Sequence, residues 1–298
     1  MRLVTWNIQW ARGADGRVDL ERIVADARRL ADFDVLCLQE VSAGCPELPG
    51  CDGSDQFAAL AALLADYTAI SSTATDTPRR LPVGPRGSPP ASHGGRRRFG
   101  NMILTRLPVG QVFSQLLPWP VDEGVKSMQR AALEVTVETA AGPLRVTTTH
   151  LEYYSQRQRI AQVERLRELH REGSAHARAE RPGAASDGPF EALPRGVGSV
   201  LVGDFNFRPE ARERGQLLAA FDDSTLPYVD AWERLHAPQA HAPTVGVHDK
   251  EQWPEAPFTC DFVFVSDDLA TRLNAVRVDA TTAASDHQPI LLELRTEG

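Results

Sequence analysis

Four apolar segments of the chain end on side chains that can bind a metal ion or transfer a proton. The residues at these ends are Asn7, Glu40, His150 and Asp204. At any single end, a polar residue would simply mark where a buried strand reaches the surface. Four such ends in one chain favour a shared site, because ligands commonly bind beyond the carboxyl ends of buried strands.

The spacing of two further pairs adds to this set. Asp204 and Asn206 are two residues apart, so in an extended chain their side chains point to the same face, where they suit a hard cation or a polarised water. Asp286 and His287 are adjacent, so they point to opposite faces and do not pair with each other. His287 therefore needs another carboxylate to fix its tautomer. Asp261 is a candidate, because an acid in its apolar run is costly to bury without a hydrogen bond.

Oxygen donors predominate among these side chains. The set comprises three acids, two amides and two histidines: Glu40, Asp204, Asp286, Asn7, Asn206, His150 and His287. Such a donor set favours Mg²⁺ or Mn²⁺ over zinc. A hard divalent cation beside a carboxylate base and histidines can hydrolyse a phosphate ester.

Strand-like and helix-like segments surround these residues. Apolar, β-branched runs predict strands at residues 3–6, 35–38, 102–104, 133–137, 145–149, 200–202, 262–265 and 290–294. Helical spacing of apolar residues predicts helices at 18–31, 55–65, 155–172 and 210–220. Ser54 and Ser155 are the expected N-caps of the second and third helices. This mixture is typical of a layered α/β domain.

Two stretches interrupt the pattern of strands and helices. Residues 75–98 are rich in Pro, Gly and Arg, and residues 173–198 are rich in Gly, Ala, Pro and Ser. Loops of this length in a compact domain are usually functional or disordered. We predict that both are loops within a single domain covering residues 1–298, because strand-like segments resume beyond each of them.

The composition is that of an ordinary globular protein. The chain has 298 residues, of which 42% are hydrophobic and 24% are charged. Its net charge of -8 argues against broad binding of duplex nucleic acid, which requires many phosphates to be neutralised. No apolar stretch reaches the ~20 residues of a membrane span, and the N-terminus lacks a signal peptide, so we expect a cytoplasmic protein.

Positive charge is concentrated in one part of this acidic chain. Residues 77–121 contain no acid and seven arginines, a local charge of +7, which leaves -15 for the rest. We predict that residues 79–98 form a lid or rim in which Arg96, Arg97 and Arg98 draw in a polyanionic substrate, because the planar fork of arginine suits phosphate oxygens. The alternative is an insertion whose arginines only keep it solvated.

Seven short blocks of the sequence resemble one superfamily. In chain order they are Thr5-Trp6-Asn7-Ile8, Leu38-Gln39-Glu40-Val41, residues 100–106, Thr149-His150-Leu151-Glu152, Gly203-Asp204-Phe205-Asn206, residues 261–266 and residues 285–290. They look like the signature blocks of the endonuclease/exonuclease/phosphatase superfamily. The resemblance spans residues 3–290, essentially the whole chain.

The resemblance implies a fold, a cofactor and roles for individual residues. The fold would be a four-layered α/β sandwich, in which two packed and mostly antiparallel sheets are flanked by helices. Mg²⁺ or Mn²⁺ would be bound chiefly by Glu40, in a metal site that also includes Asn7, Asp204 and Asp286. The catalytic residues would be His150, Asp204, Asp261 and His287. Asn206 and Asn101 would contact the substrate.

The substrate stays open between two classes of phosphate ester. One is a nucleic acid, cut by a nuclease or a DNA-end-processing enzyme, and the other is a small or lipid-linked phosphate. The acidic net charge favours the second class, whereas the block around His150 also occurs in DNA-end-processing relatives. Tyr153 and Tyr154 do not match the site tyrosine of apurinic endonucleases, and Thr259 stands where many relatives have arginine. A non-catalytic module that keeps the fold is a remote alternative, because every expected catalytic position is filled. The oligomeric state is also left open.

Overall fold

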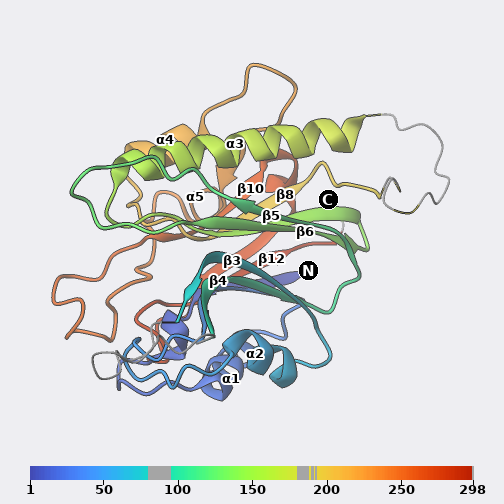
Figure 1. Ribbon diagram of the computed structural model, residues 1–298. Helices are drawn as coiled ribbons and strands as arrows, with labels where there is room; N and C mark the ends of the chain where they lie inside the picture. Colours follow the sequence, from blue (N-terminus) through green and yellow to red (C-terminus); the bar gives the residue numbers. More distant parts are fainter. Residues whose placement is uncertain (80–94, 180–187, 189–190, 192, 297–298) are drawn as a thin grey trace, which may run out of the picture.

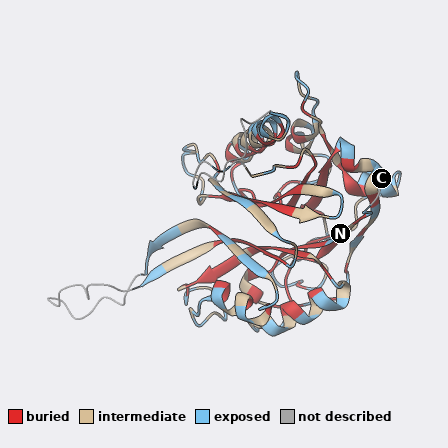
Figure 2. Cartoon of the chain, turned by 90° about the vertical axis from the view of Figure 1, so that its right-hand side faces the viewer, coloured by how far each residue is buried: buried red, intermediate tan, exposed pale blue. Residues whose placement is uncertain are grey.

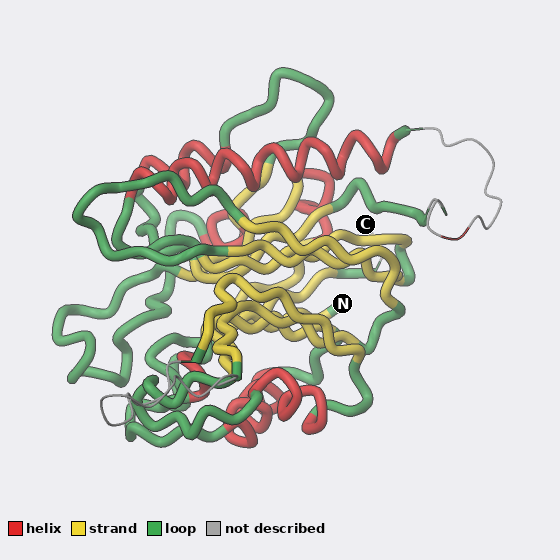
Figure 3. Tube along the Cα trace, viewed as in Figure 1, coloured by secondary structure: helices red, strands yellow, loops and turns green. Residues whose placement is uncertain are grey.

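Two six-stranded β-sheets pack face to face, with helices on the outer side of each sheet (Figure 1, Figure 3). The computed structural model describes residues 1–79, 95–179, 188, 191 and 193–296. The first sheet has the order β11-β12-β1-β2-β4-β3, and the second has the order β5-β6-β7-β8-β10-β9. Ten strand pairs make up these sheets, and only β1–β2 and β7–β8 are parallel. The predicted four-layered α/β sandwich is therefore confirmed.

The strands and helices have the following bounds. The first sheet consists of β1 (Arg2–Asn7), β2 (Val35–Ala43), β3 (Thr68–Pro78), β4 (Arg96–Thr105), β11 (Leu273–Val278) and β12 (Ile290–Leu294). The second consists of β5 (Val109–Leu116), β6 (Ala131–Thr139), β7 (Gly142–His150), β8 (Ser199–Asp204), β9 (Tyr228–Asp230) and β10 (Asp261–Ser266). The helices are α1 (Leu20–Leu30), α2 (Gln56–Leu63), α3 (Gln156–Arg178), α4 (Arg212–Leu218) and α5 (Ala231–His236), with 3-10 turns η1 (Gln9–Ala11) and η3 (Asp267–Arg272).

Alternation along the strands builds three layers of core. In β2, Val35 and Cys37 face the other sheet, whereas Leu36 and Leu38 face α1 and α2. Because side chains of a strand alternate between its faces, a strand covered on both sides reads as an unbroken apolar run. A third cluster joins α3 and α4 to the outer face of the second sheet. The central strands are accordingly buried along most of their length, while the helices expose their outer sides (Figure 2).

The two parallel pairs explain why the polar strand ends meet. Parallel strands end at the same edge of a sheet, so β1 and β2 bring Asn7 opposite Gln39, and β7 and β8 bring His150 opposite Asp204. Each pair lies in the middle of its sheet. Packing of the sheets then places both edges at one end of the sandwich.

The first predicted loop, residues 75–98, is wrong at both of its ends. Strand β3 continues to Pro78 and β4 begins at Arg96, with Thr75 paired to Phe99 and Pro78 paired to Arg96. Cross-strand hydrogen bonding overrides the polar composition of these residues. This part of the β3–β4 hairpin extends beyond the body of the molecule (Figure 2). Residues 80–94 of the predicted lid lie outside the described residues.

The second predicted loop, residues 173–198, begins too early. Helix α3 continues to Arg178 and includes Gly173. Glycine is needed at this position because a Cβ would lie 2.1 Å from the guanidinium of the buried Arg145. The glycine thus serves packing and does not end the helix. Ser155 is the N-cap of α3 as predicted, but the cap of α2 is Asp55 instead of Ser54.

Two further observations concern the chain as a whole. Among the residues described, no helix combines the length and apolar character that a membrane crossing requires. All four cysteines are free thiols: Cys37, Cys45, Cys51 and Cys260.

Candidate active site

Asp204 lies at the centre of the polar cluster between the two sheets. Its Oδ2 atom accepts a hydrogen bond from Asn7 Nδ2 at 2.9 Å. The Nε2 atoms of His150 and His287 face the same oxygen at 3.4 and 3.8 Å. Asp204 is only 1% exposed. Asn7, His150 and Asp204 are the last residues of β1, β7 and β8, so three of the four predicted strand ends meet at one carboxylate oxygen.

A glycine allows β8 to approach β7 closely enough for this arrangement. Gly203 has φ +134°, and a Cβ built there would lie 1.9 Å from the carbonyl oxygen of Thr149. Only glycine is tolerated in such a backbone conformation with so little space. The residue before Asp204 thus fixes where its carboxylate lies relative to His150.

The chain from Asp204 to Asn206 is not extended, although the prediction from spacing assumed that it was. The chain turns after Asp204, since Asn206 has φ +51° and its backbone N–H donates to Asp204 Oδ1 at 2.9 Å. The side-chain amide of Asn206 donates to the carbonyl of Leu151 at 2.8 Å. An Asx turn replaces the extended chain that the spacing argument assumed. Asn206 nevertheless lines the cavity described below.

Glu40 is held in the site by an irregularity in β2. The pairing of β2 with β4 shifts between Leu38 and Val41, and Glu40 has φ +61°. A left-handed conformation is strained for glutamate, and such strain occurs often at functional sites. Glu40 Oε1 accepts from Asn7 Nδ2 at 3.2 Å and lies 3.9 Å from His150 Nδ1.

The carboxylates of the site fit a divalent cation. Burial, together with the charge of Asp286, raises the pKa of Glu40 to about 7. Burial and the charge of Asp261 also raise the pKa of Asp204. Burial of several carboxylates close together disfavours their charged forms. A hard cation, which prefers oxygen ligands, would stabilise them. Asn7 is the one hydrogen-bond donor to the Glu40 side chain among the described residues, so its carboxylate retains free acceptor positions.

Asp286 already has several hydrogen-bond donors. Its Oδ2 atom accepts from Gln9 Nε2 at 3.1 Å, Gln252 Nε2 at 2.9 Å and Trp253 Nε1 at 3.0 Å. Its Oδ1 atom lies 3.3 Å from Ser285 Oγ. The geometry gives Asp286 a role in holding the surrounding loops, and direct binding of a metal ion by Asp286 stays a prediction.

The two histidines of the site differ in charge. His287 Nδ1 lies 2.9 Å from Asp261 Oδ2, so the predicted contact between them is present. Burial opposes the cationic form of His287, but the carboxylates of Asp261, Asp286 and Asp204 raise its pKa well above the ordinary value. Burial and the charges of Arg130 and His287 lower the pKa of His150 well below its ordinary value. At neutral pH the site therefore holds one imidazolium and one neutral imidazole.

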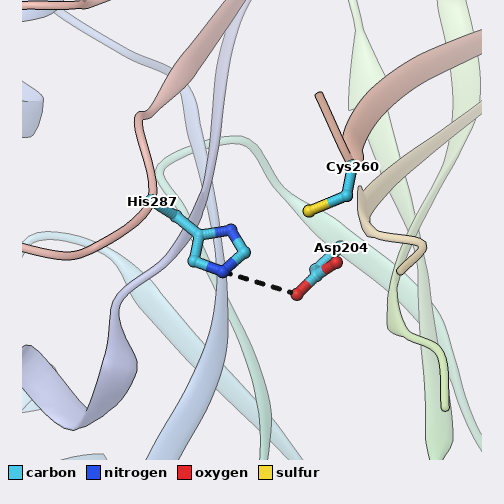
Figure 4. Close-up of side chains that lie close together, drawn as sticks. All are labelled: Asp204, Cys260 and His287. Atoms are coloured by element: carbon cyan, nitrogen blue, oxygen red, sulfur yellow. Dashed lines mark ion pairs between the residues drawn. The ribbon is translucent and has the colours of Figure 1, made fainter. Parts of the chain in front are cut away.

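Cys260 is a residue of the site that the sequence analysis missed. Figure 4 shows it beside Asp204 and His287, and their ligand atoms all lie within 4.8 Å of one another. Its Sγ lies 3.6 Å from Asp261 Oδ2, and burial together with the charges of Asp204 and Asp261 raises the thiol pKa well above its usual value. A cysteine in an apolar run looks like a core residue. Its position next to Asp261 was the one available signal.

The cluster forms the floor of a cavity of about 660 Å³. The predicted residues that line it are Glu40, Arg97, Arg98, His150, Asp204, Asn206, Asp286 and His287. Asn7 and Asp261 lie behind this surface, where Asn7 contacts Asp204 and Asp261 contacts His287. Lining residues that the sequence did not predict include Gln9, Trp10, Arg130, Tyr153, Tyr154, Trp253 and Phe258. Tyr153 and Tyr154 could have been found, because they follow the block around His150.

The predicted substrate-binding arginines have carboxylate partners. Arg96 pairs with Asp76 at 2.7 Å, Arg97 with Glu47 at 2.7 Å and Arg98 with Asp55 at 2.5 Å. These three arginines of the acid-free stretch are thus paired with acids that lie outside it, which a count along the sequence does not detect. Arg96 is not among the residues that line the cavity.

Asn101 also lies away from the cavity surface. It is 2% exposed, and its Nδ2 atom donates to the carbonyl of Ala131 at 2.9 Å. Asn101 thus joins β4 of the first sheet to β6 of the second. Contact between this amide and a substrate stays a prediction.

Comparison with known proteins identifies the family of the chain. The model of the Endonuclease/Exonuclease/phosphatase family matches residues 4–287. The chain belongs to this family. Members of the endonuclease/exonuclease/phosphatase family are metal-dependent hydrolases that act on phosphate esters, both nucleases and phosphatases. No curated protein matches the sequence.

Solved structures of the family share the fold. An endonuclease/exonuclease/phosphatase from Beutenbergia cavernae is 25% identical, with a TM-score of 0.63 over 99% of this chain and 71% of that one. The mannosyl-6-phosphatase Bt3783 of Bacteroides thetaiotaomicron is 15% identical, with a TM-score of 0.63 over 99% of both chains. The human Nocturnin catalytic domain is 18% identical, with a TM-score of 0.59 over 98% of this chain and 93% of that one. At 15% and 18% identity, the last two show a common fold only.

Proposed function

We propose that this chain is a divalent-metal-dependent phosphoesterase that hydrolyses a phosphodiester or a phosphomonoester by attack of water. The observation that carries the proposal is the convergence of Asn7, His150 and His287 on one oxygen of the buried Asp204, beside Glu40. This arrangement supports the assignment of a base, a cationic donor and a neutral imidazole to one small space at the floor of the cavity.

Asp204 is the group that accepts a proton from the attacking water. Its raised pKa makes it a stronger base than an ordinary carboxylate. Asn7 and the backbone of Asn206 each donate to one of its oxygens, which fixes the orientation of the carboxylate. A water near Oδ2 would therefore meet a base that needs no rearrangement.

His287 and His150 act on the phosphoryl oxygens. Asp261 holds Nδ1 of His287, so its Nε2–H is directed toward the reacting centre as a cationic donor. His150 is neutral and supplies one further N–H. Fixed donors of this kind stabilise charge as it develops on the phosphoryl group.

Glu40, with Asn7 and Asp204 beside it, would hold a Mg²⁺ or Mn²⁺ ion. Bound there, the ion would polarise a phosphoryl oxygen and neutralise developing charge. The acids of the floor otherwise repel a phosphate, so we expect substrate binding to depend on the ion.

A nuclease or DNA-end-processing enzyme is the second candidate. Arg97 and Arg98 in the wall of the cavity favour it, because arginines bind backbone phosphates. Their pairing with Glu47 and Asp55, and the net charge of -8, favour a small phosphate ester instead.

Hydrolysis of bis(p-nitrophenyl) phosphate with and without Mg²⁺ or Mn²⁺ tests the proposal. We expect metal-dependent turnover that Glu40→Gln reduces at least about 100-fold, the scale of one electrostatic group at a reacting centre. The matched control is Glu168→Gln, on the exposed side of α3, which should keep full activity. A wild-type chain without turnover under either metal, or a fully active Glu40→Gln variant, would contradict the proposal.

A further inference from the structure

Four aromatic side chains form a continuous wall on one part of the cavity. We call Tyr153, Tyr154, Trp253 and Phe258 the aromatic wall. Its rings contact one another edge to face, with centroids 4.8 Å apart for Tyr153–Tyr154, 6.2 Å for Tyr153–Trp253 and 5.6 Å for Trp253–Phe258. Tyr153 and Tyr154 are 45% and 55% exposed. Large aromatic side chains left open beside a site indicate a contact surface, because burial of their faces is favourable.

The aromatic wall is joined directly to the catalytic floor. The indole N–H of Trp253 donates to Asp286 Oδ2 at 3.0 Å, and Asp286 precedes His287 in the chain. Tyr153 lies three residues after His150. When a ring stacks on the aromatic wall, neighbouring atoms of the same molecule can therefore reach the floor of the cavity.

Phe258, Trp253 and Tyr153 also border a second hollow of about 390 Å³. The wall is thus a ridge between two hollows, and Asn206 and Cys260 line both of them. A planar group has space on either side of this ridge.

The charges around the wall do not suit a polyanion. The second hollow is lined by equal numbers of arginines and glutamates: Arg159, Arg208, Arg212, Glu210, Glu213 and Glu255. Arg208 lies over the ring of Phe258 at 4.2 Å, and Lys126 lies over the ring of Tyr154 at 5.7 Å, so both cations already contact the wall. A groove that follows a polynucleotide backbone needs an excess of positive charge, which is missing here among the described residues.

We propose that the aromatic wall binds a planar, uncharged ring of the substrate, and that the substrate is a phosphate ester of the nucleoside class. This inference rests on the proposed function, since the floor must hold the phosphate while the wall holds the base. A phosphorylated sugar or inositol offers no planar aromatic ring for the wall, and a long nucleic acid would lack the positive groove that it requires. Tyr153, Trp253 and Phe258 are then specificity-determining residues of the same active site.

Two substrate pairs that share a scissile bond test the assignment. Adenosine 5′-phosphate and ribose 5-phosphate differ by the base alone, and thymidine 5′-(p-nitrophenyl phosphate) and methyl p-nitrophenyl phosphate differ by the nucleoside. Stacking on an aromatic side chain is worth ~1–3 kcal/mol per base, so we expect kcat/KM to favour the nucleoside compound by about tenfold in the pair that is hydrolysed.

Variants separate stacking from the support of Asp286. Tyr153→Ala and Phe258→Ala should each lower this preference at least about threefold, mainly through a higher KM for the nucleoside compound. Trp253→Phe keeps an aromatic face but loses the N–H donor, so the preference should remain even if kcat decreases. Trp119→Ala is the control, because Trp119 is half exposed and does not line the cavity.

A binding measurement distinguishes failure of this inference from failure of the proposed function. Calorimetry in Mg²⁺ on His287→Ala, which keeps the proposed metal ligands but removes a donor to the phosphoryl group, compares adenosine 5′-phosphate with ribose 5-phosphate at strongly reduced turnover. Tighter binding of the nucleotide that is lost in the double variant with Tyr153→Ala supports the wall, even if no ester were hydrolysed. Equal affinity for the two compounds, or a preference that survives Tyr153→Ala and Phe258→Ala together, overturns the inference, whether or not bis(p-nitrophenyl) phosphate is hydrolysed.

Discussion

At the scale of single residues, the two histidines of this cavity differ in charge. His287 lies against Asp261 and is held as a cation, whereas His150 faces the charges of Arg130 and His287 and is neutral. Burial alone would leave both rings neutral, because it disfavours the charged form. The carboxylate behind His287 decides which of the two carries the proton.

The dyad of Asp261 and His287 leads to a prediction about pH. Asp261→Asn removes the nearest negative charge from His287, so the pKa of His287 should decrease. If activity requires protonated His287, the alkaline limb of the kcat/KM profile should move to lower pH, and turnover at neutral pH should decrease at least about tenfold. The comparison is with Asp222→Asn at an exposed position, which should leave the profile unchanged. An unaltered alkaline limb in Asp261→Asn would remove His287 from the role of cation.

At the scale of elements, close contacts between strands set the geometry of the floor. Strand β8 lies so close to β7 that Gly203 has no room for a Cβ, and the irregular pairing of β2 directs Glu40 toward Asn7. These features restrict the backbone to strained conformations, and they fix the positions of the reacting groups.

Gly203→Ala tests the close approach of β7 and β8. The new methyl group would meet the Thr149 carbonyl, and alanine disfavours φ +134°, so the free energy of unfolding should decrease by about 3 kcal/mol or more. Gly215→Ala is the matched control in α4, where nothing lies within 4 Å of the added Cβ, and it should be neutral or stabilising by ~0.5–1 kcal/mol. Urea denaturation of both variants gives the comparison, and similar losses in the two would refute the steric argument.

The β3–β4 hairpin offers a pair of adjacent arginines for a second prediction. Arg96 and Arg97 both have carboxylate partners, but only Arg97 lines the cavity. Arg97→Gln should raise KM roughly two- to fivefold, because it removes a cation and leaves Glu47 unpaired beside an anionic substrate. Arg96→Gln should leave KM unchanged. Steady-state kinetics at low and moderate salt measure both variants, and equal effects would show that position in the cavity does not matter.

At the scale of the whole molecule, the candidate metal site connects the two sheets. Asn7 and Glu40 belong to the first sheet, and His150, Asp204 and Asp261 belong to the second. The cavity thus lies at the one end of the sandwich where the carboxyl ends of the central strands of both sheets meet. A ligand bound there stabilises the packing of one sheet on the other, in proportion to its affinity for the folded chain.

Metal removal and pH should therefore act together on the melting temperature. The pKa of Glu40 is raised from 4.5 to about 7, so its contribution to stability is fully present below 4.5 and is lost as pH rises through about 7. The chelated protein should lose stability over this interval, and Mg²⁺ should raise the melting temperature more at pH ~8 than at pH ~5. Thermal unfolding in Mg²⁺ or chelator measures this. Glu40→Gln should abolish the metal shift, and a shift that is equal at both pH values or persists in the variant would contradict the assignment.

Much of the fold could be predicted because it follows from local patterns of apolar and polar side chains. Short, β-branched apolar runs such as 35–38 and 200–202 are typical of strands covered on both faces, and the capping serine at 155 marks the start of α3. The blocks around Asn7, Glu40, His150 and Asp204 are contiguous in sequence, so family membership could be recognised from them before any contact was known.

The sequence by itself determined the two-sheet fold, the family and, apart from Cys260, the polar residues that meet at the floor of the cavity. Only the tertiary structure decided that Glu40 lies at a strand irregularity, that the arginines of the hairpin are neutralised, and that Trp253 and Tyr153 stand side by side. The physical reason is that secondary structure follows from the period of neighbouring side chains. Ion pairs and ring contacts instead depend on cross-strand register and on loops that meet after folding, and residues such as Trp253 and Asp286 are brought together only then.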